Sequence, residues 1–101
     1  MKTFTVAVVG ATGAVGQTML AILEQRKFPI SELHVLASER SAGEQIDYAG
    51  KKHTVRNLAD FDPKGVDFAL FSAGGSTSKE YAPKFAAAGA IVIDKNYELH
   101  K

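Results

Sequence analysis

The sequence has no cysteine and no tryptophan among its 101 residues. Without cysteine the chain has no disulfide, no zinc site built from thiolates and no cysteine nucleophile. An excess of charge of one sign is also missing, because 12 basic and 11 acidic side chains leave a formal net charge of +1. This balance gives no electrostatic reason to expect a nucleic acid or a membrane surface as a partner.

Long apolar runs are absent as well. No run reaches the roughly 18–20 residues that a helix needs to span a bilayer. The N-terminus has one lysine followed by a strand-like run, which is not the pattern of a signal peptide. We therefore expect a cytoplasmic protein. The length of 101 residues and the hydrophobic share of 46% predict one folded domain rather than a disordered chain.

Strand-like and helix-like segments alternate along the chain. Apolar, β-branched runs of strand length predict core strands at residues 4–9, 33–37, 66–71 and 90–93. Two further short segments, residues 45–48 and 52–55, flank a glycine-containing turn and are typical of a β-hairpin. The expected fold is therefore α/β: a Rossmann-type, mostly parallel sheet with flanking helices and an inserted β-hairpin.

Two helices are expected between these strands. The first is predicted over residues 14–26, with an apolar face that becomes part of the core: Val15, Met19, Ile22 and Leu23. The second is predicted to start at a capping box, with Thr77 as the N-cap and Glu80 reaching back to it. Gly89 is the expected C-cap of that helix.

A glycine-rich turn joins the first strand to the first helix, with Gly10, Gly13 and Gly16 spaced three residues apart. A backbone can approach phosphate oxygens only where no Cβ intervenes, and a helix N-terminus supplies free N–H groups and a positive dipole end. This context predicts a site for the pyrophosphate of a dinucleotide, to which the Thr12 hydroxyl contributes. The alternative is a strand–helix turn that binds no ligand. We assign residues 1–94 to a dinucleotide-binding domain and residues 95–101 to an atypical tail.

The choice between NAD and NADP is expected at the end of the second strand, where an acidic side chain suits the ribose of NAD and an arginine suits the 2′-phosphate of NADP. Arg40 stands there between the hydroxyl side chains of Ser38 and Ser41, which favours NADP. The carboxylate of Glu39 favours NAD, unless this side chain points to solvent. An ordinary solvated loop is the alternative.

The segment Ser72–Ser76 follows the third core strand. Ligands of open α/β sheets lie beyond the carboxyl ends of the strands, so its small residues either accept a nucleotide or simply shape the turn. The three histidines, His34, His53 and His100, show neither metal spacing nor a paired acid. We therefore expect surface or half-buried histidines, with no metal site and no catalytic residue.

Four segments occur in one order: residues 6–16, 36–43, 69–76 and 86–94. Together they resemble the N-terminal part of aspartate-semialdehyde dehydrogenase. The resemblance implies an NADPH-dependent reductive dephosphorylation of β-aspartyl phosphate, a step toward lysine, threonine and methionine. By this resemblance, the pyrophosphate contacts Gly10, Thr12, Gly13, Ala14 and Val15. The 2′-phosphate contacts Ser38, Arg40 and Ser41. The remaining part of the nucleotide lies along Ser72, Ala73 and Gly74.

The sequence departs from this family after Asp94, where the family's phosphate-binding arginine has no counterpart in Lys95–Lys101. The family's cysteine nucleophile, its acid–base histidine and its substrate domain are also missing. We expect this chain to bind NADP(H) but not to catalyse alone. Three alternatives stay open: a non-catalytic NADP-binding module, a module that self-associates through an exposed sheet edge at residues 90–93, and the matching domain of N-acetyl-γ-glutamyl-phosphate reductase.

Overall fold

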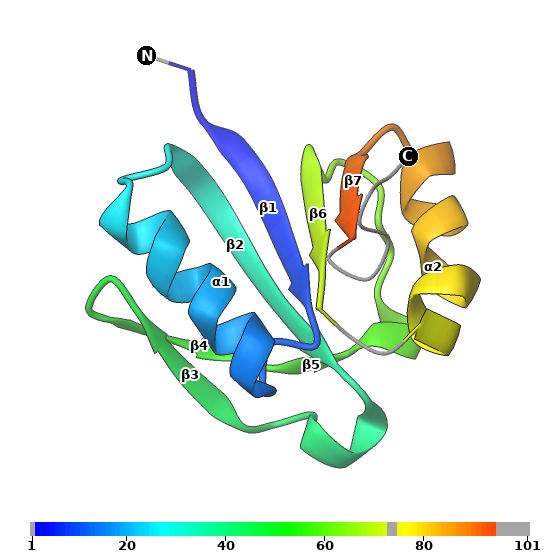
Figure 1. The fold of residues 1–101 in the computed structure, drawn as a ribbon, viewed down its shortest axis with the longest axis horizontal. Coiled ribbons are helices and arrows are strands. Elements are labelled where there is room, and N and C mark those ends of the chain that lie inside the picture. The colour runs from blue at the N-terminus through cyan, green and yellow to red at the C-terminus, as the bar shows by residue number, and fades with distance from the viewer. Residues whose placement is uncertain (1, 73–74, 95–101) are drawn as a thin grey trace.

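A computed structural model describes residues 2–72 and 75–94 of the chain (Figure 1). Its main feature is a sheet of five parallel strands in the order β5-β2-β1-β6-β7. The strand bounds are β1 Phe4–Val9, β2 Ile30–Ala37, β5 Arg56–Asn57, β6 Phe68–Phe71 and β7 Ile91–Asp94. A separate antiparallel hairpin consists of β3 Gln45–Tyr48 and β4 Lys51–Thr54. The predicted fold class is confirmed, including the inserted hairpin.

Two helices, α1 (Ala14–Gln25) and α2 (Gly75–Ala87), cover opposite faces of the sheet. Alternate residues of β1 show this, because successive side chains of a strand point to opposite faces. Val6 and Val8 pack in one buried cluster with Leu20 of α1, whereas Ala7 and Val9 pack in the other with Phe85 of α2. Each central strand is therefore buried on both faces, as its continuous apolar sequence predicts.

The buried face of α1 differs from the predicted one. Gly16 and Leu20 are buried, while Val15 and Ile22 keep 36% and 44% of their surface exposed. The face is centred on Gly16 because the helix lies closest to the backbone of the glycine turn there. The prediction is confirmed for Met19 and Leu23, which pack against the core cluster, and is wrong for Val15 and Ile22. A glycine carries no hydrophobic signal, so the sequence did not indicate Gly16 as part of the buried face.

The start of α2 also differs from the prediction. The helix begins at Gly75, so Thr77 lies inside it and is not the N-cap. Tertiary packing overrides the local capping signal, since the helix buries Phe85 and packs Tyr81 and Ala82 against the core cluster. The prediction that Gly89 caps the C-terminal end of this helix is confirmed. Gly89 has a φ of 101°, and the N–H of Ala90 donates to the carbonyl of Phe85 at 3.0 Å.

Two short elements were not predicted: β5 and the 3₁₀ turn η2 (Leu58–Asp60). A second 3₁₀ turn, η1 (Glu39–Ser41), occupies the polar loop after β2.

None of the helices in the described ranges is long and apolar enough to cross a membrane.

Candidate functional site

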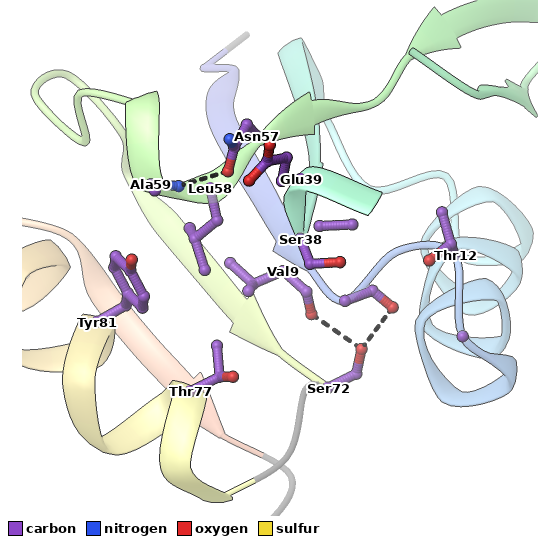
Figure 2. A pocket seen from close by; sticks show the side chains of 13 residues that line it. Val9, Thr12, Ser38, Glu39, Asn57, Leu58, Ala59, Ser72, Thr77 and Tyr81 are labelled. Carbon is purple, nitrogen blue, oxygen red and sulfur yellow. Dashed lines mark hydrogen bonds between the residues drawn. The ribbon is translucent and has the colours of Figure 1, made fainter. Parts of the chain in front are cut away.

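A cavity of about 600 Å³ lies at the carboxyl ends of β1, β2 and β6 (Figure 2). These strands end at Val9, Ala37 and Phe71. A crevice at this edge is where open α/β sheets bind their ligands. Five of the residues predicted to contact the cofactor line it: Gly10, Thr12, Gly13, Ser38 and Ser72.

The glycine turn forms one wall of this cavity. Gly10 has a φ of 85°, a conformation that favours glycine, and its N–H donates to the carbonyl of Leu36 at 2.8 Å. Gly13 is the N-cap of α1 and is exposed. The first turn of α1 carries no acidic side chain. The positive end of its dipole is therefore free to act on an anion at this position.

A side chain at Gly13 and one at Gly16 would meet different surroundings. A Cβ added at Gly13 would lie 3.6 Å from the carbonyl oxygen of Gly10, which is an ordinary contact. A Cβ at Gly16 would overlap that same carbonyl group and approach the Cα of Ala11 to 2.7 Å. Gly16 therefore permits the close packing of the helix against the turn, whereas the fold does not need a glycine at position 13.

Ser72 ties the end of β6 to the glycine turn. Its hydroxyl donates to the carbonyl oxygens of Val9 at 2.9 Å and Gly10 at 3.1 Å (Figure 2). The backbone N–H of Ser72 also donates to the carbonyl oxygen of Val9, at 2.9 Å. These bonds fix the base of the cavity, so Ser72 has a structural part here. Ala73 and Gly74, predicted beside it, lie outside the described residues.

The loop after β2 borders two hollows. Ser38 and Glu39 line the main cavity, and together with Arg40 they also line an adjacent hollow of about 510 Å³. The hydroxyl of Thr12 donates to that of Ser41 at 3.4 Å, which links the glycine turn to this loop. Arg40 is exposed and lies next to the cavity rather than in its described lining. Ala14 and Val15 are the first two residues of α1 and are not among the residues that line the cavity.

The opposite wall consists of residues that the sequence analysis missed. Asn57, Leu58 and Ala59 come from β5 and η2, and Thr77 and Tyr81 come from α2 (Figure 2). The Asn57 side chain accepts a hydrogen bond from the N–H of Ala59 at 3.0 Å and so caps η2. An asparagine ahead of a short turn is a recognisable capping signal.

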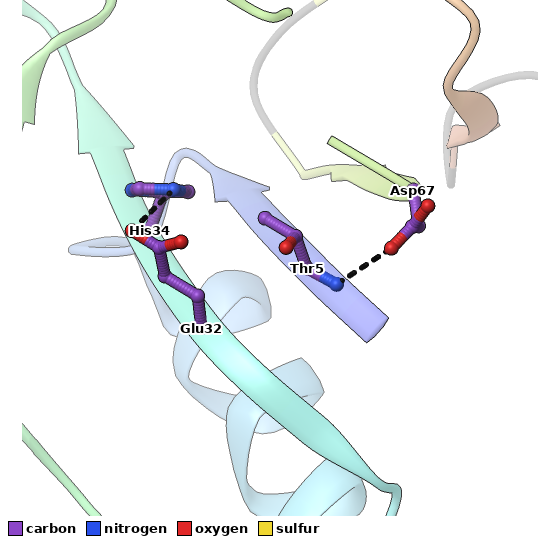
Figure 3. A network of polar contacts seen from close by, with 4 residues as sticks. All are labelled: Thr5, Glu32, His34 and Asp67. Carbon is purple, nitrogen blue, oxygen red and sulfur yellow. Dashed lines mark hydrogen bonds and ion pairs between the residues drawn. The ribbon is translucent and has the colours of Figure 1, made fainter. Parts of the chain in front are cut away.

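His34 lies in a different cavity, and the described residues contain no group of three or more side chains suited to a metal ion. Its Nε2 lies 3.4 Å from the Glu32 carboxylate, beside a hydrogen bond of 2.8 Å from the Thr5 N–H to Asp67 (Figure 3). Its pKa is lowered from 6.5, mainly by burial, which outweighs the carboxylate of Glu32. The prediction of a half-buried histidine is confirmed, but the expectation that no histidine has a paired acid is wrong for His34, because residues two apart in a strand share a face and this places Glu32 beside it.

Comparison with known proteins identifies the family. The family model described as "Semialdehyde dehydrogenase, NAD binding domain" matches residues 5–99. The chain belongs to this family. It is 56% identical over 94 residues to the aspartate-semialdehyde dehydrogenase of Aquifex aeolicus, covering 92% of this chain and 28% of that protein. The chain thus spans less than a third of the curated relatives it matches.

Solved structures of semialdehyde dehydrogenases agree with the fold. Aspartate semialdehyde dehydrogenase II of Vibrio cholerae, in complex with ASA, superposes with a TM-score of 0.90 at 53% identity, over 92% of this chain and 30% of that one. The Candida albicans enzyme with NADP has a TM-score of 0.69 at 22% identity, over 99% and 32% of the two chains, and shows the fold alone. The resemblance to aspartate-semialdehyde dehydrogenase is confirmed, and N-acetyl-γ-glutamyl-phosphate reductase is not favoured.

Proposed function

We propose that the chain binds NADP(H) across the carboxyl ends of its strands, as the cofactor-binding part of an aspartate-semialdehyde dehydrogenase. The observation that carries this proposal is the glycine turn, which opens into a cavity of about 600 Å³ at the N-terminus of α1. Exposed Gly13, a helix dipole without an acidic neighbour and the Thr12 hydroxyl suit a pyrophosphate. The match to the family model described as "Semialdehyde dehydrogenase, NAD binding domain" supports the choice of a dinucleotide.

The ribose end of the cofactor is proposed to lie over the loop after β2. Arg40 and the hydroxyls of Ser38 and Ser41 supply the donors that a 2′-phosphate needs. Glu39 lines both hollows and repels an added phosphate, while it suits the 2′-hydroxyl of NAD. The preference for NADP therefore depends on Arg40 outweighing Glu39.

The family reaction needs more than this site. Reduction of an acyl phosphate through a thioester requires a thiolate to displace phosphate before a hydride arrives from NADPH. This chain has no cysteine. We therefore propose that it supplies the nucleotide site and that the 101 residues alone do not turn over β-aspartyl phosphate.

An NMR titration tests the proposed site. Added NADP is expected to shift the backbone amide signals of Gly10, Gly13, Ser38 and Ser72, because these residues line the cavity. Amides of the hairpin, such as that of Lys51 at the start of β4, serve as the internal reference. Shifts confined to the hairpin or to the His34 cavity would contradict the proposed position of the cofactor.

A second candidate function is self-association through β7, the terminal strand of the described sheet. An unpaired strand edge offers free N–H and carbonyl groups to another chain. The apolar side chain of Ile91, 58% exposed, favours such pairing. Sedimentation over a range of concentrations tests it, and a monomer at the highest concentration would count against it.

A further inference from the structure

The cavity that contains His34 has a volume of about 310 Å³ and lies near the amino-terminal ends of β1 and β2. The two strands contribute Thr5, Glu32 and His34 to its lining (Figure 3). Alternate residues of a strand share a face, and the next residues on this face, Ala7 and Leu36, belong to the buried cluster under α2. The sheet therefore changes from polar to apolar along this face, and its polar part borders a cavity instead of the core.

The other wall of the His34 cavity comes from the segment between β5 and β6. This segment contributes Arg56, Phe61, Asp62, Lys64 and Gly65. The Phe61 ring packs against the core, 6.0 Å from the ring of Phe85, and lies 4.9 Å from the ring of His34. The guanidinium group of Arg56 lies over the same Phe61 ring, 5.6 Å from its centre. An anchored aromatic ring thus holds a cation at the edge of the cavity.

Four fixed charges line the His34 cavity, two of each sign: Arg56, Lys64, Glu32 and Asp62. His34 adds no charge at neutral pH, because burial lowers its pKa from 6.5. Within residues 2–72 and 75–94, neither Arg56 nor Lys64 forms an ion pair. Charges of both signs therefore line one cavity without neutralising each other in direct contact, which suits a ligand that carries both signs.

The two carboxylates have contacts of their own that still leave capacity for a ligand. Oε2 of Glu32 lies 3.4 Å from Nε2 of His34, and Oδ1 of Asp62 accepts a hydrogen bond of 3.0 Å from the N–H of Lys64. An ionised carboxylate has about four acceptor positions, so each can also accept from an ammonium group. The guanidinium of Arg56 and the ammonium of Lys64 are the donors that suit a carboxylate.

The size of the His34 cavity restricts the ligand further. Its volume of about 310 Å³ is about half that of the main cavity, at about 600 Å³. It lies at the lower end of the range for small-molecule sites, about 300–1,000 Å³. The ligand is therefore much smaller than a dinucleotide and carries one group of each charge.

We propose that the His34 cavity is a second ligand site, which binds a free α-amino acid as a zwitterion. Arg56 and Lys64 bind the carboxylate of the amino acid, and Glu32 and Asp62 bind its ammonium group. The site lies at the opposite ends of the strands from the main cavity, so the proposal does not depend on the cofactor site.

An NMR titration of the 101-residue chain with L-alanine tests this proposal. Propionate and ethylamine, each of which lacks one charged group of L-alanine, are titrated in parallel. Two variants, Arg56→Gln and Glu32→Gln, each remove one charge from the cavity. Arg26→Gln and Glu44→Gln are the matched controls, because these exposed residues do not line it. Circular dichroism checks that every variant is folded.

We expect L-alanine to cause saturable shifts that are largest at the amides of Thr5, His34 and Lys64. The two cavity variants are expected to bind L-alanine at least about tenfold more weakly, as for the loss of a hydrogen bond to a charged group. The matched controls are expected to bind it as the unchanged chain does. Propionate and ethylamine are also expected to bind at least about tenfold more weakly than L-alanine.

Three results would overturn the proposal. One is equal affinity for L-alanine and either single-charge probe, since the site would then recognise only one charge. Another is the same affinity for L-alanine in both cavity variants as in the unchanged chain. The third is the absence of saturable shifts at the cavity residues. None of these results bears on the binding of NADP, which is followed at the amides of Gly10 and Gly13.

Discussion

Gly16 packs directly against the carbonyl group of Gly10, with no room for a side chain between them. An added Cβ would overlap the Gly10 carbonyl oxygen and lie 2.9 Å from its carbon. Both neighbours are backbone, so neither moves aside without shifting the helix or the turn. This contact fixes how closely α1 approaches the turn, and with it the orientation of the helix N-terminus toward the cavity.

The first prediction concerns this contact. Gly16→Ala is expected to lower the free energy of unfolding by about 1–3 kcal/mol, the usual cost of overpacking. Helix propensity alone acts in the opposite direction, favouring alanine by about 1 kcal/mol. Urea denaturation measures the change. Gly13→Ala is the matched control, since its Cβ makes an ordinary contact at 3.6 Å. Equal stability of the two variants would contradict the close packing.

A second prediction separates binding from folding at Gly13. Gly13→Leu is expected to abolish dinucleotide binding with little loss of stability, because the glycine has an ordinary φ of −80° and faces the cavity. Gln25→Leu, on the exposed end of the same helix, controls for added apolar surface. Calorimetry and thermal melting measure the two properties. Undiminished affinity in Gly13→Leu would show that the phosphates bind elsewhere.

A third prediction tests the choice of cofactor. Arg40→Ala is expected to weaken NADP by roughly 1.5–3 kcal/mol, the range for a hydrogen bond to a charged group, and to leave NAD almost unchanged. Glu39→Gln is expected to have the opposite effect on NADP, because it removes a negative charge beside the 2′-phosphate. Titrations of each variant with both cofactors measure these effects. The same loss for NAD and NADP in Arg40→Ala would mean that Arg40 does not contact the 2′-phosphate.

A fourth prediction concerns pH. Burial lowers the pKa of His34 below 6.5. The carboxylate of Glu32 raises this pKa by a smaller amount, and the positive charge of Arg56 lowers it further. The unfolded chain therefore binds this proton at a higher pH than the folded chain does. The free energy of unfolding is expected to fall as the pH drops below about 6.5, and to be unaffected by His34 above it.

His34→Gln removes this titration and gives the comparison. Urea unfolding at about pH 7.5 and about pH 5.5 is expected to show a smaller loss of stability in the variant than in the unchanged chain. Identical losses in the two proteins would mean that the histidine has the same pKa in the folded and unfolded states.

The sequence predicted the fold well where local signals agreed with tertiary packing. Apolar runs marked β1 and β6 because these strands are buried on both faces. The start of α2 was misplaced because packing of Phe85 and Tyr81 on the core outweighed the local signal at Thr77. The strand β5 was missed because it has only two residues and is recognised by its pairing with Leu36 and Ala37, not by its own composition.

The sequence predicted the side of the cavity at the carboxyl ends of β1, β2 and β6, but not the opposite wall. Glycine spacing identified Gly10 and Gly13, since that turn is contiguous in the chain. The opposite wall, with Asn57 and Tyr81, depends on how η2 and α2 fold back over the sheet edge. Long-range proximity of this kind leaves no periodic pattern in a single sequence.

Calorimetric titration of the 101-residue chain with NADP, and in parallel with NAD, tests the central claim most directly. Binding of NADP that is tighter than NAD by tenfold or more, or about 1.4 kcal/mol, is the result we predict from Arg40 at the edge of the cavity. Absence of heat with either cofactor, from a chain shown by circular dichroism to be folded, would contradict the proposal that these residues form a working cofactor site.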